Sequence, residues 1–277
     1  MALQKTIERD CTFSGSGFIC DQQVQVTLSP AGVDEGIRFI RTDLEGAPEI
    51  PVHPRAQVSV EHCTTLQNGD AKVLVVEHLL AACFALGVTN LKISVNGLEL
   101  PTCDGSSLPW AELINNAGVC EQGRQARQIV LKHPVYVTSS DGSFILALPS
   151  DTPIFEYLLD YSQDPEIGCS FASVKPDRDD LLRTLLPART FIMENEALAA
   201  LDAGKIRSTD EKLGLVIREG RQPALRMPGE LARHKILDMM GDLYVLGARL
   251  QARCIGVKSG HKLNAQLVRE LSARYPR

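Results

Sequence analysis

The stretch RMPGELARHKILDMMGDLYVLGAR, residues 226–249, decides the fold because it predicts one long helix with distinct faces. At about 100° per residue, one side of that helix is apolar and carries Leu237, Met240, Leu243, Tyr244 and Gly247. A polar stripe of His234, Lys235, Asp238 and Asp242 separates it from a second apolar edge at Met239 and Leu246. Such a stripe does not face only bulk water, and buried charges must pair or bind a metal.

Outward from this helix, the sequence alternates between short strands and helices. Strands are expected at residues 24–28, 57–60, 91–95, 98–100, 128–131, 135–137, 144–148 and 254–257. Further helices are expected at residues 77–86, 109–118, 179–186 and 194–203, and at the C-terminus. Gly87 is a natural end for the first of these, and the Asn96-Gly97 pair predicts a hairpin.

Strands followed by helices in both halves favour the α+β class, with two layered domains at residues 1–125 and 126–277. Because no sequence repeat links the halves, a duplicated unit is an architectural hypothesis. The chain has 277 residues, 44% of them hydrophobic, which is ample for a folded core.

Composition excludes several classes of protein. The longest stretch without a charged residue, residues 78–91, is 14 residues long. A bilayer-spanning helix needs about 20, so no transmembrane segment is expected. The N-terminus has no apolar signal region, and the eight cysteines form no Cys-x-x-Cys pair. Free thiols in a reducing cytoplasm are therefore expected.

Charge is unevenly distributed along the chain. Residues 218–277 contain 12 Lys and Arg against 5 Asp and Glu, a net charge of +7, whereas the whole chain has a net charge of -5. This asymmetry indicates either an anionic ligand or a solvated basic face. No nucleic-acid partner is expected, because aromatic residues are only 5% and do not alternate with basic ones.

Two short motifs could hold a metal ion. His234 and Asp238 are four residues apart and thus share one helix face, where they could bind a metal or form an intrahelical hydrogen bond. Glu77-His78 begins the first apolar helix, so that a metal-bound His78 would leave Glu77 beside it as a base. Alternatively, Glu77 would face the helix dipole and His78 would pack in the core.

Together, His78, His234 and Asp238 would form the three-ligand set typical of catalytic zinc, with one position left for water or substrate. His261 follows a glycine after the last predicted strand and could act as a general acid.

These motifs occur in an order that resembles the zinc-dependent UDP-3-O-acyl-N-acetylglucosamine deacetylases, which perform the committed step of lipid A synthesis. The resemblance covers nearly the whole chain. The matching blocks are VEHLLAA (76–82), LPTCDGS (100–106), ARTF (188–191), RHKILD (233–238) with GDL (241–243), and SGH (259–261) with Asn264.

The resemblance implies two α+β domains with their helices sandwiched between two sheets and the active site between the domains. It implies zinc held by the three ligands above and an acylated UDP-amino sugar as small-molecule substrate. Glu77 would deprotonate water, and His261, oriented by Asp242, would protonate the leaving amine. Thr190 would stabilise the oxyanion, Lys235 would face the UDP phosphates, and Phe191 would contact the substrate.

The sequence also departs from the family pattern. A family histidine is Ile19 here, and residues 207–214 and 228–232 replace family blocks around the substrate site. Residues 192–206, which correspond to the family's acyl-chain passage, keep few long apolar side chains. Two alternatives therefore stay open: a diverged paralogue acting on another acetylated sugar nucleotide, and a non-catalytic homologue that binds metal or ligand.

Overall fold

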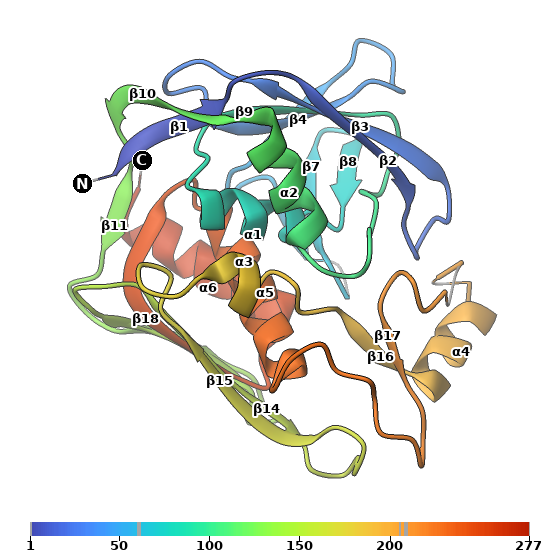
Figure 1. Ribbon diagram of the computed structural model, residues 1–277. Coiled ribbons are helices and arrows are strands. Elements are labelled where there is room, and N and C mark those ends of the chain that lie inside the picture. The colour runs from blue at the N-terminus through green and yellow to red at the C-terminus, as the bar shows by residue number, and fades with distance from the viewer. Residues whose placement is uncertain (1, 60–61, 205, 208–209, 277) are drawn as a thin grey trace.

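Two main sheets lie on opposite sides of a layer of helices (Figure 1). The computed structural model describes residues 2–59, 62–204, 206–207 and 210–276. The first sheet has the strand order β2 (Cys11–Ser16), β3 (Gln23–Pro30), β9 (Leu91–Val95), β4 (Ile37–Arg41) and β5 (Glu49–Pro51). Along β3 the side chains of Val24, Val26 and Leu28 are buried and alternate with more exposed ones, as a half-buried strand requires.

The second sheet is built entirely from the other half of the chain. Its order is β12 (Val135–Thr138), β13 (Phe144–Pro149), β18 (Arg249–Val257), β14 (Ile154–Tyr161) and β15 (Gly168–Val174). The short strand β11 (Gln128–Val130) runs parallel to the start of β18. The expected strands at residues 128–131, 135–137, 144–148 and 254–257 are confirmed.

Both sheets have the same topology. In each, two hairpins come first in the chain, and a later strand is inserted between them, antiparallel to one neighbour and parallel to the other. A helix precedes that central strand and another follows it in the chain: α1 (Glu77–Leu86) and α2 (Leu108–Ala117) around β9, α5 (Glu230–Tyr244) and α6 (His261–Arg274) around β18. The α+β class with a helical layer between two sheets is thus confirmed.

Smaller elements complete the fold. They are the pair β1 (Leu3–Ile7) and β10 (Val119–Gln125), the sheet β6 (Gln57–Ser59), β7 (Thr64–Asn68) and β8 (Ala71–Leu74), and the pair β16 (Phe191–Met193) and β17 (Leu215–Ile217). The remaining helices are α3 (Leu181–Thr184) and α4 (Glu194–Asp202). Of the strand expected at residues 57–60, residue 60 lies outside the described residues. No helix of the described chain is long and apolar enough to span a membrane.

Helix α1 matches the predicted range residue for residue. After Glu77 and His78 its sequence is apolar throughout, which suits a helix that is buried on all faces from residue 77 to residue 84. Gly87 ends it in a left-handed conformation with φ of 72°, and Val88 N–H then bonds the carbonyl of Cys83. The helix therefore crosses the interior with Glu77 and His78 in its first turn.

Two predicted helices prove shorter than expected. The helix expected at residues 226–249 covers only α5, because Gly229 takes a left-handed conformation with φ of 67° and Gly247 takes one with φ of 59°. The helix expected at residues 179–186 is reduced to the single turn α3, because Asp180 and Leu185 both leave helical geometry. Both predicted ranges therefore extended past residues that leave helical geometry.

The predicted hairpin at Asn96-Gly97 is wrong. Strand β9 already has β3 on one edge and β4 on the other, so no edge is free for a returning strand. Residues 98–100 run instead beside β8, where Leu74 N–H bonds the carbonyl of Leu98 and Leu100 N–H bonds that of Leu74. Tertiary pairing outweighed the local turn signal.

One hydrophobic core runs through both halves, because α1 and α5 pack against each other between the sheets. The two main sheets separate on either side of residue 125, and we keep that residue as a proposed domain boundary. All eight cysteines are free.

The crossing of α1 and α5 depends on Gly241. A Cβ at this position would come within 3.0 Å of Glu77 Cα and closer still to its carbonyl group. We expect Gly241→Ala to lower the free energy of unfolding by about 1–3 kcal/mol, since overpacking must displace backbone. Chemical denaturation would measure this, with Gly260→Ala as control, because nothing lies within 4 Å of a Cβ at Gly260. Equal stability of the two variants would contradict this role.

Candidate metal centre

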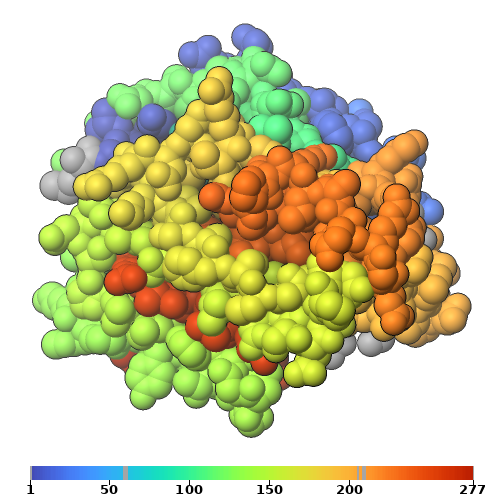
Figure 2. All heavy atoms as spheres, turned by 60° about the horizontal axis from the view of Figure 1, so that its bottom comes forward, coloured from blue at the N-terminus to red at the C-terminus, as the bar shows by residue number. Residues whose placement is uncertain are grey.

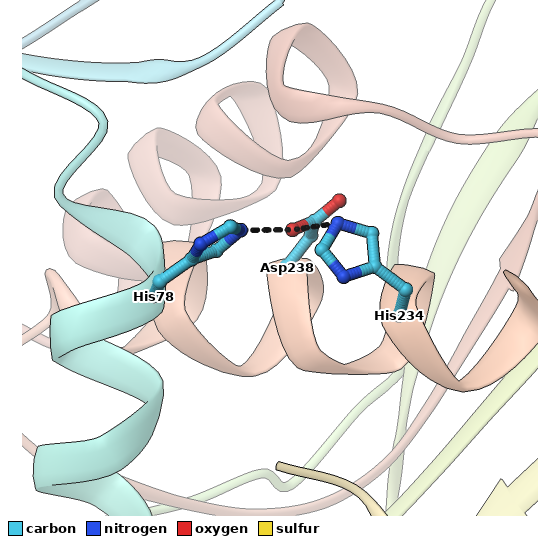
Figure 3. A group of neighbouring side chains, drawn as sticks. All are labelled: His78, His234 and Asp238. Carbon is cyan, nitrogen blue, oxygen red and sulfur yellow. Dashed lines mark ion pairs between the residues drawn. The ribbon is translucent and has the colours of Figure 1, made fainter. Parts of the chain in front are cut away.

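Three side chains converge where α1 meets α5 (Figure 3). His78 extends from the first turn of α1, and His234 and Asp238 lie one turn apart on α5. All three are buried, and their ligand atoms lie within 4.8 Å of one another. Oδ1 of Asp238 is 3.2 Å from Nε2 of His234 and 3.6 Å from Nε2 of His78.

The hydrogen-bond partners decide between the two interpretations of the His-x-x-x-Asp spacing. Nδ1 of His234 lies 3.1 Å from the carbonyl oxygen of Ala188, which can only accept, so Nδ1 carries the hydrogen. Nε2 then presents a lone pair to Oδ1 of Asp238, an oxygen that has no hydrogen-bond partner among the described residues. Two buried lone pairs facing each other fit a shared cation rather than an intrahelical hydrogen bond.

The pKa directions agree with a ligand set. Burial lowers the pKa of His234 to about 3, so its imidazole is neutral near pH 7, as a metal ligand must be. Burial alone would raise the pKa of Asp238, but His234 and Lys235 outweigh it and hold that pKa well below the usual range. The residues present therefore fit a divalent metal ion, held by two imidazoles and one carboxylate.

A second group of side chains borders this centre. Nε2 of His261 lies 3.9 Å from Oε1 of Glu77 and 4.0 Å from Oδ2 of Asp238. On the far side of the ring, Nδ1 donates to Oδ2 of Asp242 at 2.9 Å. The imidazole thus lies between an orienting carboxylate and the proposed ligand set, with Glu77 opposite it.

Glu77 and His261 are both strongly perturbed. Burial raises the pKa of Glu77 to about 7, although His261 and His78 partly oppose this. Burial alone would lower the pKa of His261, but the charge and hydrogen bond of Asp242 reverse the effect and raise it to about 10. Near neutral pH the site can thus hold a protonated imidazole beside a carboxyl group close to its titration point.

Phe191 and Lys235 lie beside the metal centre. The Phe191 ring is 6.4 Å from that of His234, and the Lys235 ammonium lies 5.5 Å from the Phe191 ring centre. The same ammonium donates to Oδ2 of Asp238 at 2.9 Å. Lys235 therefore contacts a proposed metal ligand directly, as expected of two residues in one polar stripe of the helix.

Thr190 is fixed mainly through its backbone. Its N–H donates to the carbonyl of Gly105 at 2.7 Å, and its own carbonyl accepts from Leu215 N–H at 2.8 Å. Gly214 packs so closely that a Cβ there would come within 2.9 Å of Thr190 Cγ2. Segments from both halves of the chain thus hold this residue beside Phe191.

An ion-pair network holds the same region together. Arg189 donates to Glu230 on α5, and Arg226 bonds both Asp104 and the carbonyl of Pro187. In Figure 2 the orange segment that includes residues 220–230 lies against the yellow segment that includes residues 180–190. Residues adjacent to Thr190 and to the start of α5 are therefore tied to one another and to the first half.

Ion pairs also explain much of the basic last fifth of the chain. Arg218, Arg249, Arg253, Lys258 and Arg274 each pair with an acidic residue. Most of those acids precede residue 218, where the sequence carries its excess negative charge. Much of this basic charge is thus neutralised within the protein, and the charge asymmetry alone does not indicate a ligand.

Comparison with known proteins decides the family. A model of the UDP-3-O-acyl N-acetylglycosamine deacetylases matches residues 4–273. The chain belongs to this deacetylase family. UDP-3-O-acyl-N-acetylglucosamine deacetylases from Chlamydia felis, Geotalea uraniireducens and Thermosynechococcus vestitus are each 34% identical to it. These matches cover 97%, 99% and 97% of this chain, and 96%, 90% and 94% of the respective relatives.

Two of the segments expected to depart from the family pattern, the loop at Ile19 and residue 207, contact each other. Ile19 N–H and Cys20 N–H donate to the buried carboxylate of Glu99, which fixes the loop at these two residues. The carbonyl of Phe18, the residue before Ile19, accepts a hydrogen bond from Arg207 N–H at 2.7 Å. Residues 208 and 209 lie outside the described residues, whereas Gly214 packs against Thr190. The altered segment thus reaches the site.

Proposed function

We propose that this protein is a zinc-dependent deacetylase that removes acetate from an acylated UDP-N-acetylglucosamine in lipid A biosynthesis. The observation that carries the proposal is the buried His78–His234–Asp238 group with Glu77 and His261 beside it, in a chain of the deacetylase family. The relatives named above act on UDP-3-O-acyl-N-acetylglucosamine by name. A cytoplasmic location is proposed as well, in keeping with the free thiols.

Zinc held by His78, His234 and Asp238 would supply a Lewis acid for water and for the acetamide carbonyl. Glu77 is the proposed general base, because its carboxylate borders the ligand set and its pKa is raised to about 7. His261 is the proposed general acid, since its raised pKa of about 10 keeps the ring protonated. Asp242 accepts a hydrogen bond from Nδ1 of the His261 ring, so that Nε2 of the same ring faces the reacting groups.

Three further residues have proposed roles around the substrate. Thr190 would donate a hydrogen bond from its hydroxyl to the developing oxyanion. The two hydrogen bonds of its backbone support a fixed position for that hydroxyl. Phe191 would contact the substrate from beside His234. Lys235 would bind a UDP phosphate with its ammonium group, in addition to contacting Asp238.

The Lys235 role gives a direct prediction. Lys235→Ala is expected to weaken UDP binding by about 10-fold, as for the loss of one charge-assisted contact. Calorimetry with UDP at saturating zinc would measure this. Lys258→Ala is the matched control, because Lys258 pairs with Asp160 at 3.9 Å on the second sheet and has no proposed role. Unchanged UDP affinity in Lys235→Ala would argue against the phosphate contact.

Two measurements test the function itself. Metal analysis of the native protein should give one zinc per chain, and an assay with UDP-3-O-acyl-N-acetylglucosamine should release acetate. A native protein without metal and without activity would contradict the proposal. Release of acetate only from a different acetylated sugar nucleotide would favour a diverged paralogue, for which the altered loop at Ile19 and the altered segment at residues 207–214 provide the structural reason.

A further inference from the structure

Thr64, the first residue of β7, contacts both carboxylates that flank His261. Its backbone N–H donates to Oε2 of Glu77 at 3.0 Å, and its hydroxyl donates to Oδ1 of Asp242. The side chain is buried, since Thr64 is only 2% exposed. One residue of the first half thus bonds the proposed base on α1 and the acid-orienting carboxylate on α5.

Each contact fixes one oxygen and leaves the other for the site. With Oε2 of Glu77 held by Thr64, Oε1 is the oxygen that faces His261. With Oδ1 of Asp242 held by the Thr64 hydroxyl, Oδ2 accepts from Nδ1 of His261 and from Nδ2 of Asn264 at 2.8 Å. Asp242 is fully buried, and neither carboxylate can rotate without losing a hydrogen bond.

The backbone beside Thr64 is also constrained. Its carbonyl accepts from Val76 N–H, immediately before α1. The preceding residue, Val75, is buried with φ of 60°, a left-handed conformation that costs a β-branched residue appreciable strain. Such strain persists only where surrounding contacts over-determine the backbone. The Thr64–Val76 bond is one of the contacts that fix the start of α1.

We propose that Thr64 is a positioning residue that holds Glu77 and Asp242 in one fixed mutual orientation, so that proton removal and proton donation occur within a single rigid frame. This inference rests on the proposed function. Thr64 itself does not contact substrate in this role, because it is buried and its hydroxyl is bonded to Asp242.

Thr64→Val tests the proposal most directly. Valine keeps the shape of threonine and the N–H bond to Glu77 but removes the hydroxyl bond to Asp242. We expect kcat to fall about 10- to 100-fold, because small misplacements of catalytic groups have effects of this size. The KM and the bound zinc should be unchanged. Thr64→Ser restores the hydroxyl and should recover kcat to within about threefold of wild type.

Thr65→Val is the matched control. Thr65 is the next residue, is equally buried, and places its hydroxyl 3.7 Å from the sulfur of Cys63 rather than on Glu77 or Asp242. Its variant should turn over like the wild type. Wild-type kcat in Thr64→Val would overturn the proposal. The proposal would also be overturned by an equal loss of kcat in both valine variants, by loss of zinc, or by a low kcat in Thr64→Ser. Each of these results would indicate a general structural disturbance of β7.

A second readout separates this inference from the proposed function. Crystal structures of Thr64→Val and Thr64→Ser should show the Asp242 carboxylate and the His261 ring displaced in the first and retained in the second. Unchanged positions in Thr64→Val would overturn the positioning role whether or not the enzyme turns over. A wild-type protein that releases no acetate while these displacements occur would instead contradict only the proposed function.

Discussion

Replacing Glu77 by alanine is expected to lower kcat for acetate release by about 10²- to 10⁴-fold, the contribution typical of a positioned general base. Glu77 lies beside the proposed metal ligands and is not one of them, so zinc should remain bound at one per chain. Metal analysis and steady-state kinetics on the same preparation would measure both quantities. A low kcat with zinc still bound identifies a general base, because loss of a metal ligand would lower the zinc content and the activity together.

Glu77→Gln is the control that keeps the size and shape of the glutamate side chain. Glutamine can still accept the N–H of Thr64 but cannot take a proton from water at neutral pH. Its kcat should therefore be as low as that of the alanine variant. If Glu77→Ala kept kcat within about threefold of wild type, a base at this position would be refuted. A non-catalytic homologue would show the same UDP affinity in both variants and in wild type, and no turnover in any of them.

Asp238→Ala is expected to have the largest effect on metal binding. Loss of a group that only supports a metal ligand costs about 10- to 100-fold in affinity, so loss of the ligand itself should cost more than about 100-fold. The substitution also removes the partner of the Lys235 ammonium, which would then repel a cation in the same enclosure. Acetate release should fall with the bound zinc.

Equilibrium dialysis against a zinc-buffered solution would measure this affinity. Asp160→Ala is the control, because Asp160 is a partly exposed carboxylate on β14 that pairs with Lys258. An Asp238→Ala variant that binds zinc as tightly as Asp160→Ala would show that Asp238 is not a ligand. Addition of zinc in excess should restore part of the activity if affinity alone is lost.

Local signals in the sequence were enough for α1 and for the face of α5. The run of helix formers from Glu77 to Leu86 ends at a glycine, and both ends of the helix lie where those signals predict. Periodicity alone put His234, Asp238 and Asp242 on one stripe, and all three are buried together. In both cases the deciding information lies within a few residues along the chain.

Where the deciding contact is distant in sequence, prediction failed or was silent. Asn96-Gly97 is a common hairpin signal, but both edges of β9 are paired with strands from elsewhere in the chain. Thr64 lies 178 residues from Asp242, and no motif links the two. Likewise, the sequence left the basic excess of the last fifth open between an anionic ligand and a solvated face, because its acidic partners lie in the rest of the chain.

The repeated topology of the two sheets has a consequence for how the chemistry is divided. Helices α1 and α5 hold equivalent places in the two repeats, each immediately before the inserted central strand. One repeat contributes the proposed base and one imidazole, while the other contributes two imidazoles, those of His234 and His261, and two carboxylates. Neither repeat alone carries a complete centre. The proposed reaction therefore needs both repeats, and neither sheet with its own two helices is expected to release acetate by itself.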